Sequence, residues 1–132
     1  MFKGLDGFHC RITNTLKSTD TYISIRPEDM MRIKNALLND FTYLTLRECG
    51  RYEVVKVLGT DMTSDNTSSG QMRIERDQIG TGAFTFTCTS SLFYELNTLC
   101  VQEVISNRLV NYALKSYADA LERRISTLEQ KG

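Results

Sequence analysis

The C-terminal part of the chain carries an apolar repeat that permits few structures. Five residues follow one another at intervals of four, three, four and three, namely Leu114, Ala118, Leu121, Ile125 and Leu128. This is the spacing of a helix that buries one narrow seam, with Leu at the d positions and Ala or Ile at the a positions of a heptad. Neither Gly nor Pro occurs between residues 101 and 131. We therefore predict a single helix over residues 99–132.

A helix of this kind needs something to cover its seam, because an isolated helix is marginally stable in water. It could fold back onto its own domain or pack on copies of itself. The narrow seam and the terminal position favour self-association, so we predict that the five seam residues form an oligomer interface. Ile at a with Leu at d favours two strands over three, although fewer than three heptads make that preference soft.

The charge balance argues against two classes of partner. The chain has 132 residues, a length typical of one domain, and carries sixteen basic and sixteen acidic residues. It therefore has no overall field to attract nucleic acid or an anionic membrane, and we predict neither as a partner. No apolar run approaches the roughly 20 residues of a membrane span. The first residues lack the apolar core of a signal peptide, which predicts retention in the cytosol.

The four cysteines have no spacing typical of a metal site. They stand at positions 10, 49, 88 and 100, which fits neither a CxxC pair nor a zinc ribbon. We predict reduced structural thiols, since a free Cys is commonly a small buried hydrophobe. His9, beside Cys10, is the one histidine of the chain; a single His gives weak support for a nucleophile or a metal ligand, so a structural role is favoured for both residues.

The first hundred residues alternate between strand and turn signals. A short strand is expected over residues 20–25, with Ile23 and Ile25 on one face. A helix is expected near residues 27–39, because Pro27 suits a first helical position and because Met30, Ile33 and Leu37 share one face. The best hairpin candidate is "FTYLTLRECGRYEVVKVLG", residues 41–59, with Gly50 free to adopt a positive φ in its turn.

The remaining β signals are shorter. "TDMTSDNTSSGQ", residues 60–71, is expected to be an exposed, mobile polar loop. Strands are expected in "MRIER", "AFTFTCT" and "SLFYEL", residues 72–76, 83–89 and 91–96. Together these elements predict a mainly β fold, with a small antiparallel β-sandwich or barrel over residues 1–98 and a short coiled-coil-like helix after it.

The densest polar pattern is "RIERDQIGTGAF", residues 73–84, called here the arginine turn. We predict that it forms a structural clasp with the neighbouring strand, made by Glu53, Arg76, Gln78, Gly80, Thr81 and Gly82. Arg76 would form a charge-assisted pair with Glu53 across the sheet, because its guanidinium offers five donors in a rigid fork. Gln78 would satisfy amides of the turn, the two glycines would allow its backbone conformation, and Thr81 would close it through its hydroxyl.

The same residues argue against catalysis and cofactors. No lysine or helix start follows Gly80 or Gly82, as a phosphate loop requires, and "GTGAFT" opens a strand pattern where a dinucleotide fingerprint opens a helix. Asp61 and Asp65 lack the spacing of an EF-hand. No acids, bases or nucleophiles form a recognised constellation. We therefore predict a protein that is not an enzyme and has no catalytic residue, cofactor or metal.

Three segments, in order, resemble a module near the amino ends of tailed-bacteriophage virion proteins, including tail-fibre, collar and neck-attached fibre proteins. The segments are "TDTYISI", "FTYLTLRECGRYEVVKVLG" and "GQMRIERDQIGTGAFTFTCTSSLFYEL", and the resemblance covers residues 15–98. The matching residues are Tyr43-Leu44-Thr45-Leu46, Glu53-Val54-Val55-Lys56-Val57, Arg76, Gln78, Gly80, Thr81 and Ala83. The chain departs from the module at Asp77, Gly82 and Ser90-Ser91, and its loop at 60–70 is longer.

The resemblance implies a structural virion protein, made in the host bacterial cytoplasm and assembled into the particle. It implies a homotrimer, whereas the seam composition favours a dimer. We expect an attachment or adaptor component of the neck, collar or tail fibre that docks onto other virion proteins. The alternatives are a monomeric cytosolic binding or regulatory module, or a phage assembly chaperone, with the helix folded back on the sheet.

Overall fold

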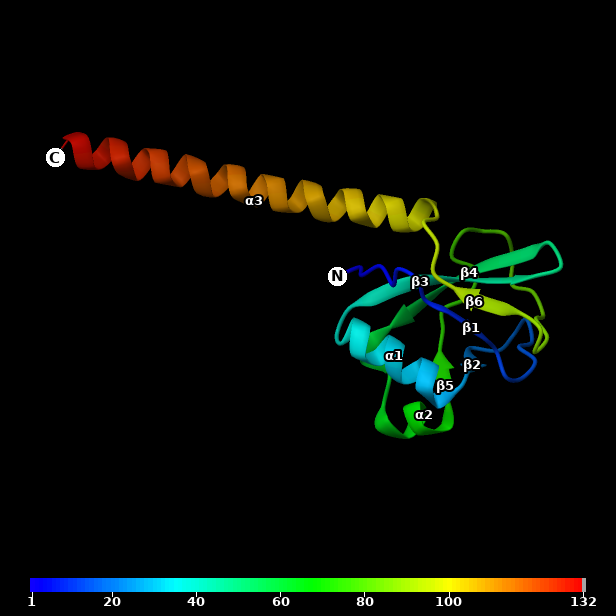
Figure 1. Ribbon diagram of the computed structural model, residues 1–132. Helices are drawn as coiled ribbons and strands as arrows, with labels where there is room; N and C mark the ends of the chain where they lie inside the picture. Colours follow the sequence, from blue (N-terminus) through cyan, green and yellow to red (C-terminus); the bar gives the residue numbers. More distant parts are fainter. Residues whose placement is uncertain (132) are drawn as a thin grey trace.

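The computed structural model describes residues 1–131, and for residues 110, 112, 121 and 123–131 it describes the backbone alone. Figure 1 shows a small β domain from which one long helix extends. The elements are β1 (His9–Arg11), β2 (Tyr22–Ser24), α1 (Pro27–Leu37), β3 (Phe41–Glu48), β4 (Arg51–Leu58), the 3₁₀ turn η1 (Gly59–Asp61), α2 (Ser64–Ser69), β5 (Gln71–Arg73), β6 (Ser91–Phe93) and α3 (Thr98–Lys131).

The predicted hairpin forms the centre of the larger sheet. β3 and β4 pair antiparallel over eight residues each, in a four-stranded sheet of order β1-β6-β3-β4. Cys49 and Gly50 both have positive φ, 48° and 81°, which is the conformation of a two-residue type I′ turn. This confirms the antiparallel hairpin at residues 41–59.

A second sheet joins β2 to β5, also antiparallel. Within the described residues the ladders stay separate, linked by the single bridge between Lys56 and Glu75. The coarse prediction of antiparallel sheets followed by a C-terminal helix is confirmed. The finer prediction of a sandwich or barrel stays a prediction, because the sheet does not close.

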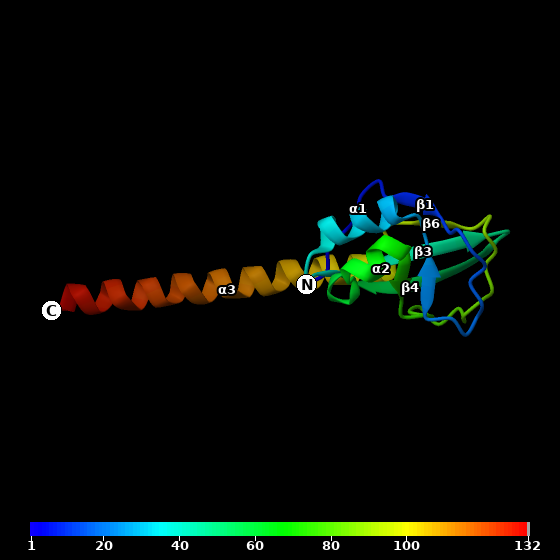
Figure 2. The ribbon, with the colours of Figure 1, turned by 90° about the horizontal axis from the view of Figure 1, so that it is seen from below.

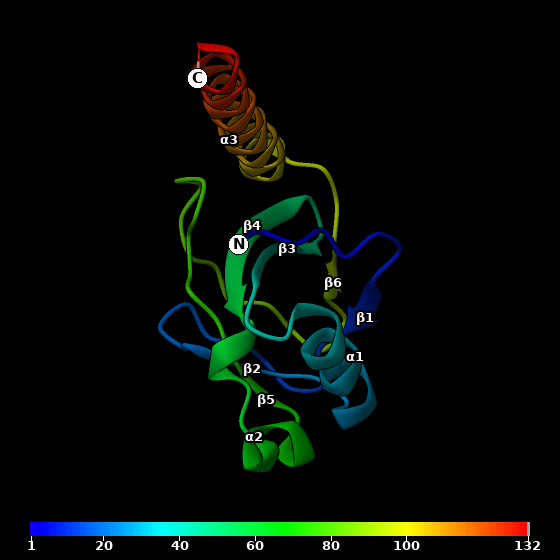
Figure 3. The same ribbon diagram turned by 90° about the vertical axis from the view of Figure 1, so that its left-hand side faces the viewer.

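The main core lies between the larger sheet, the smaller sheet and α1. Val55 and Val57 of β4 enter it, together with Ile23 of β2. Val54 points to the other face of β4, where it joins Tyr43 in a second cluster. The two faces of β4 are thus both apolar, and in Figure 3 α1 and α2 lie on one side of β3 and β4 while α3 lies on the other.

α1 forms where its sequence predicts. Pro27 stands at its start, and Met30, Ile33 and Leu37 are all fully buried. The helix ends at Leu37, two residues before the predicted end, because Leu38 turns to a φ of 53° and donates its N–H to the Lys34 carbonyl. The predicted amphipathic helix therefore packs its apolar face into the core.

The polar segment after β4 is not the mobile loop that the sequence predicts. It folds into η1 and α2, and Met62 and Thr67 are buried. The side chain of Thr63 caps α2 by accepting the N–H of Asn66 at 3.2 Å, and Gly70 ends the helix in the left-handed region at φ 72°. Turn-forming residues thus serve here as helix caps.

Three strand predictions need correction. Residues 83–89 are not a strand, and their only ladder contact among the described residues is the bridge of Phe86 with Leu16. β5 covers residues 71–73 and β6 covers 91–93, so both are shorter than expected. β1, which was not predicted, pairs with β6 and adds the amino-terminal segment to the larger sheet.

α3 confirms the predicted C-terminal helix over 34 residues. Its base packs on the β domain, where Cys100 is fully buried in a cluster with Phe2, Tyr43 and Val54. Beyond its first turns the helix extends past the domain, as Figures 1 and 2 show. Of the predicted interface residues, Leu114 and Ala118 are exposed. The side chains of Leu121, Ile125 and Leu128 lie outside the described residues.

Candidate functional site

The arginine turn is anchored by a buried ion pair. Nε of Arg76 lies 2.5 Å from Oε2 of Glu53, and Nη2 lies 2.8 Å from Oε1. The Glu53 side chain, on β4, is fully buried, and that of Arg76 is 9% exposed. The structure therefore places the two predicted clasp residues in a bidentate contact, the strongest geometry available to these groups.

The other donors of Arg76 tie three carbonyls together. Nη1 donates to the backbone oxygens of Lys17 and Asp20, at 2.8 and 2.9 Å, and Nη2 donates to that of Phe84 at 2.8 Å. With the two bonds to Glu53, all five N–H groups of the guanidinium are used. Arg76 thus joins three segments that are far apart in the sequence.

The Glu53 carboxylate is hydrogen-bonded through both of its oxygens, as the Arg76 guanidinium is through all of its N–H groups. Besides Arg76, it accepts the backbone N–H of Asp77 at 3.2 Å and of Phe84 at 3.0 Å. A buried charge is tolerated when it is paired and its remaining lone pairs are hydrogen-bonded. We call this unit the Arg76 clasp: the Arg76 and Glu53 side chains with their backbone partners at 17, 20, 77 and 84.

The rest of the predicted site is arranged around this clasp. Gly80 and Gly82 have φ of 78° and 98°, as a tight turn needs. Gln78 donates to the Arg76 carbonyl at 3.0 Å, so it satisfies a carbonyl where an amide was predicted. The Thr81 hydroxyl donates to the Tyr52 carbonyl at 3.3 Å, which fastens the turn to β4.

Sequence reasoning missed several members of the clasp. Asp77 adopts a φ of 53°, and its carboxylate accepts the Gly82 N–H at 2.8 Å. The tolerance of Asp for the left-handed region was an available signal. Lys17, Asp20 and Phe84 contribute backbone groups, which leave no trace in a side-chain pattern.

A second polar cluster lies at the tip of the hairpin. Glu48 accepts the hydroxyls of Thr87 and Thr89, the latter at 2.7 Å, and the Thr87 N–H at 3.1 Å. These hydrogen bonds lower the pKa of Glu48 from 4.5 to about 2, and the bond from the Thr87 side chain has the largest effect. The cluster fastens the hairpin tip to the chain that follows the arginine turn.

Acid should therefore loosen this cluster. Because the pKa of Glu48 is lowered in the folded state, its contribution to stability is present above pH 4.5 and is lost as the pH falls toward 2. We expect the urea midpoint to fall less between pH 5 and pH 2 in Glu48→Gln than in the wild type. Glu75→Gln, at an exposed position, is the matched control. Equal pH profiles for wild type and Glu48→Gln would contradict the assignment.

The cysteines are all free thiols, in two environments. Cys10 and Cys100 are buried, and burial raises the pKa of Cys10 to about 12, so its thiol stays protonated. Cys49 and Cys88 are exposed. The prediction of buried thiols therefore holds for two of the four. His9 lies beside the Phe93 ring, with centroids 6.4 Å apart.

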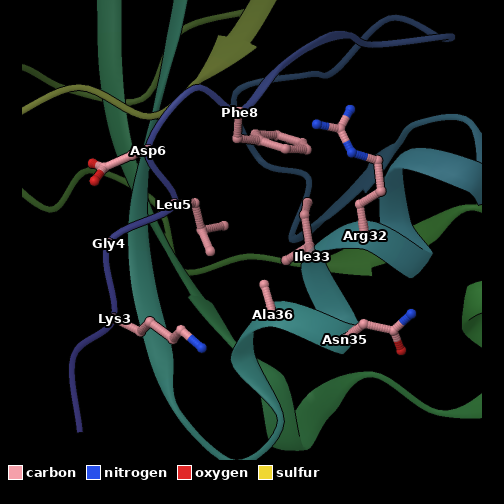
Figure 4. A pocket seen from close by; sticks show the side chains of 9 residues that line it. All are labelled: Lys3, Gly4, Leu5, Asp6, Phe8, Arg32, Ile33, Asn35 and Ala36. Carbon is pink, nitrogen blue, oxygen red and sulfur yellow. The ribbon is translucent and has the colours of Figure 1, made fainter.

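One pocket lies between the amino-terminal segment and α1. It encloses about 480 Å³. Figure 4 shows Leu5 and Phe8 facing Ile33 and Ala36 of α1, with Asp6 directed away. The Arg32 guanidinium lies 5.4 Å above the Phe8 ring. Lys3, Asp6 and Arg32 are the charged residues of its lining.

In the part of the chain that the structure describes, no group of three or more His, Cys, Asp or Glu residues is placed to hold a metal ion. No helix within that part is both long and apolar enough to cross a membrane. No protein-family model and no curated protein matches the chain.

Proposed function

We propose that this chain is a non-enzymatic structural protein of a tailed-bacteriophage virion, an attachment or adaptor component of the neck, collar or tail fibre. The β domain docks onto other virion proteins, and α3 brings identical chains together. One observation carries the proposal: α3 runs beyond its own domain and leaves Leu114 of the predicted seam 63% exposed. A stable apolar seam of this kind needs a partner.

The clasp supports a building role. Three residues of the arginine turn that match the virion module, Arg76, Gln78 and Thr81, hydrogen-bond to β4, and Arg76 also bonds to the carbonyls of residues 17 and 20. Every donor of Arg76 and both oxygens of Glu53 bond within the chain. None is left to bind a substrate, which favours a rigid docking domain. We further propose that the two sheets work as one sandwich-like unit in docking.

Two lines of reasoning give different numbers of copies in the oligomer. The resemblance implies three copies about a common axis, and the seam composition favours two. Either oligomer would serve an adaptor, because both present more than one β domain to the particle.

A second candidate is favoured by the base of α3. Cys100, Leu99 and Val104 pack on the β domain, so part of the helix does fold onto its own sheet. A monomeric cytosolic binding module, or an assembly chaperone absent from the finished particle, would extend this contact along the helix. Mass spectrometry of purified particles separates a virion component from a chaperone, because only the former is retained.

Association through the seam has a direct test. We expect Leu114→Asp to weaken self-association by about 2–4 kcal/mol, because it places an unpaired charge in an apolar interface. Ser116→Asp, on an exposed position of the same helix, should leave association unchanged. Light scattering after size-exclusion chromatography reads the mass of each variant, and circular dichroism checks that both stay folded. A wild type that is monomeric at high concentration would contradict the proposed function.

A further inference from the structure

The heptad frame of the seam continues into the base of α3. Counted back from Leu114 at d, it passes through Asn111 at a and Asn107 at d to Val104 at a and Cys100 at d. A straight helix drifts only about 20° per heptad relative to this frame, so these positions stay on one side of it. Cys100 is fully buried and Val104 partly buried against the β domain, whereas Leu114 is exposed.

This continuity restricts how a second helix can lie along the seam. A copy running parallel and in register would bring its own base, with its own β domain, to the level of Cys100 and Val104. The first domain already occupies the seam side there (Figures 1 and 2). A copy running antiparallel brings no β domain to that level. The two β domains then lie at opposite ends and do not compete for space.

The charges past the base fit the same orientation. Lys115 and Glu122, both exposed, occupy successive e positions. In an antiparallel pair, the e positions of one helix face the e positions of the other. We take the register in which Ala118 of one copy is opposite the d position 121 of the other. Lys115 of each copy then lies beside Glu122 of its partner. In a parallel pair the same two residues face the g positions 110 and 117, which carry Val and Tyr. Lys115 and Glu122 therefore meet opposite charges twice in the first arrangement and meet none in the second.

We propose that α3 binds one second copy of this chain in the antiparallel orientation, with Lys115 and Glu122 selecting it. The inference rests on the self-association proposed above and replaces the three-copy expectation of the resemblance with two. A helix of 34 residues is about 50 Å long. The pair is then a strut that carries a β domain at each end and joins two docking sites.

Disulfide trapping distinguishes the orientations. In a Cys49→Ser, Cys88→Ser background, chains with Lys115→Cys are mixed with chains with Glu122→Cys and oxidised. We expect a covalent dimer in the mixture. We expect none from Asn111→Cys alone, because position 111 lies far from its copy in an antiparallel pair. In a parallel, in-register pair position 111 would face itself and crosslink.

Charge reversal provides an independent readout. Lys115→Glu should raise the dissociation constant about 3–10-fold, and adding Glu122→Lys should restore it. Self-crosslinking of Asn111→Cys, or an oligomer that crosslinks in neither experiment, overturns the antiparallel pair and leaves self-association standing. A wild type that sediments as a monomer at all concentrations overturns both proposals.

Discussion

Replacing Arg76 with Met is expected to lower the free energy of unfolding by about 3–5 kcal/mol, because it leaves the fully buried Glu53 carboxylate without its counter-ion. The carbonyls of Lys17, Asp20 and Phe84 lose their donor in the same step. Small domains are stable by only about 5–15 kcal/mol, so the loss removes much of the total. Urea unfolding followed by circular dichroism measures it.

Two further variants make the Arg76 result specific. Arg47 and Glu95 form an exposed pair at 3.7 Å, and Arg47→Met should cost no more than about 1 kcal/mol. The double variant Arg76→Met, Glu53→Met should recover part of the loss, because it removes the unpaired charge. If Arg76→Met left both stability and oligomeric state unchanged, the clasp would have no structural role.

Gly70→Ala is the second substitution with a large expected effect, about 3 kcal/mol of stability. An added Cβ would lie 2.0 Å from the Ile25 carbonyl oxygen, closer than any non-bonded contact. Relieving it moves the end of α2 away from Ile25, whose N–H donates to the Gly70 carbonyl at 2.9 Å. The thermal midpoint of unfolding should fall accordingly.

Gly50→Ala separates this clash from backbone strain. Gly50 has a φ of 81°, close to the 72° of Gly70, but nothing lies within 4 Å of a Cβ added there. Its replacement should cost about 1 kcal/mol, the ordinary penalty of a side chain in the left-handed region. Equal losses at the two glycines would show that the close approach to Ile25 carries no weight.

The elements that could be predicted are those whose apolar residues follow a helical or strand pattern and enter the core. Met30, Ile33 and Leu37 marked one face of α1, and the aromatic and β-branched runs of β3 and β4, with Gly50 between them, gave the hairpin and its turn. In both cases the pattern reports burial directly, because the core is built from the same side chains.

The segment at 83–89 was predicted as a strand for a reason that the clasp explains. Its alternating Phe84 and Phe86 do reach the core. The backbone of Phe84, however, bonds to the Glu53 and Arg76 side chains, and Phe86 bonds to Leu16 alone. The side chains of Glu53 and Arg76 thus supply the hydrogen bonds that a neighbouring strand would otherwise supply. The spacing of apolar residues in the sequence does not distinguish these two cases.

The ion pair itself was predictable and its network was not. Glu53 and Arg76 stood out as opposite charges on neighbouring strand signals. Two of the three carbonyls that bind the guanidinium belong to a turn 56 to 59 residues earlier in the chain, and the third belongs to Phe84. A backbone oxygen is the same in every residue, so the sequence does not mark it. Thr63 and Gly70, which cap α2, are residue types typical of helix caps. Because the surrounding residues are also typical of turns, the segment was predicted as a loop.

The place of β6 in the larger sheet has a consequence for synthesis. β6 lies between β1 and β3, so the amino-terminal strand has no neighbour to join until residue 93 has left the ribosome. Translation then delivers the base of α3, where Cys100 completes the cluster with Phe2, Tyr43 and Val54. If α3 brings copies together as proposed, a nascent chain meets its partner along the rest of the helix only after its own β domain can close, which limits entanglement between half-folded chains.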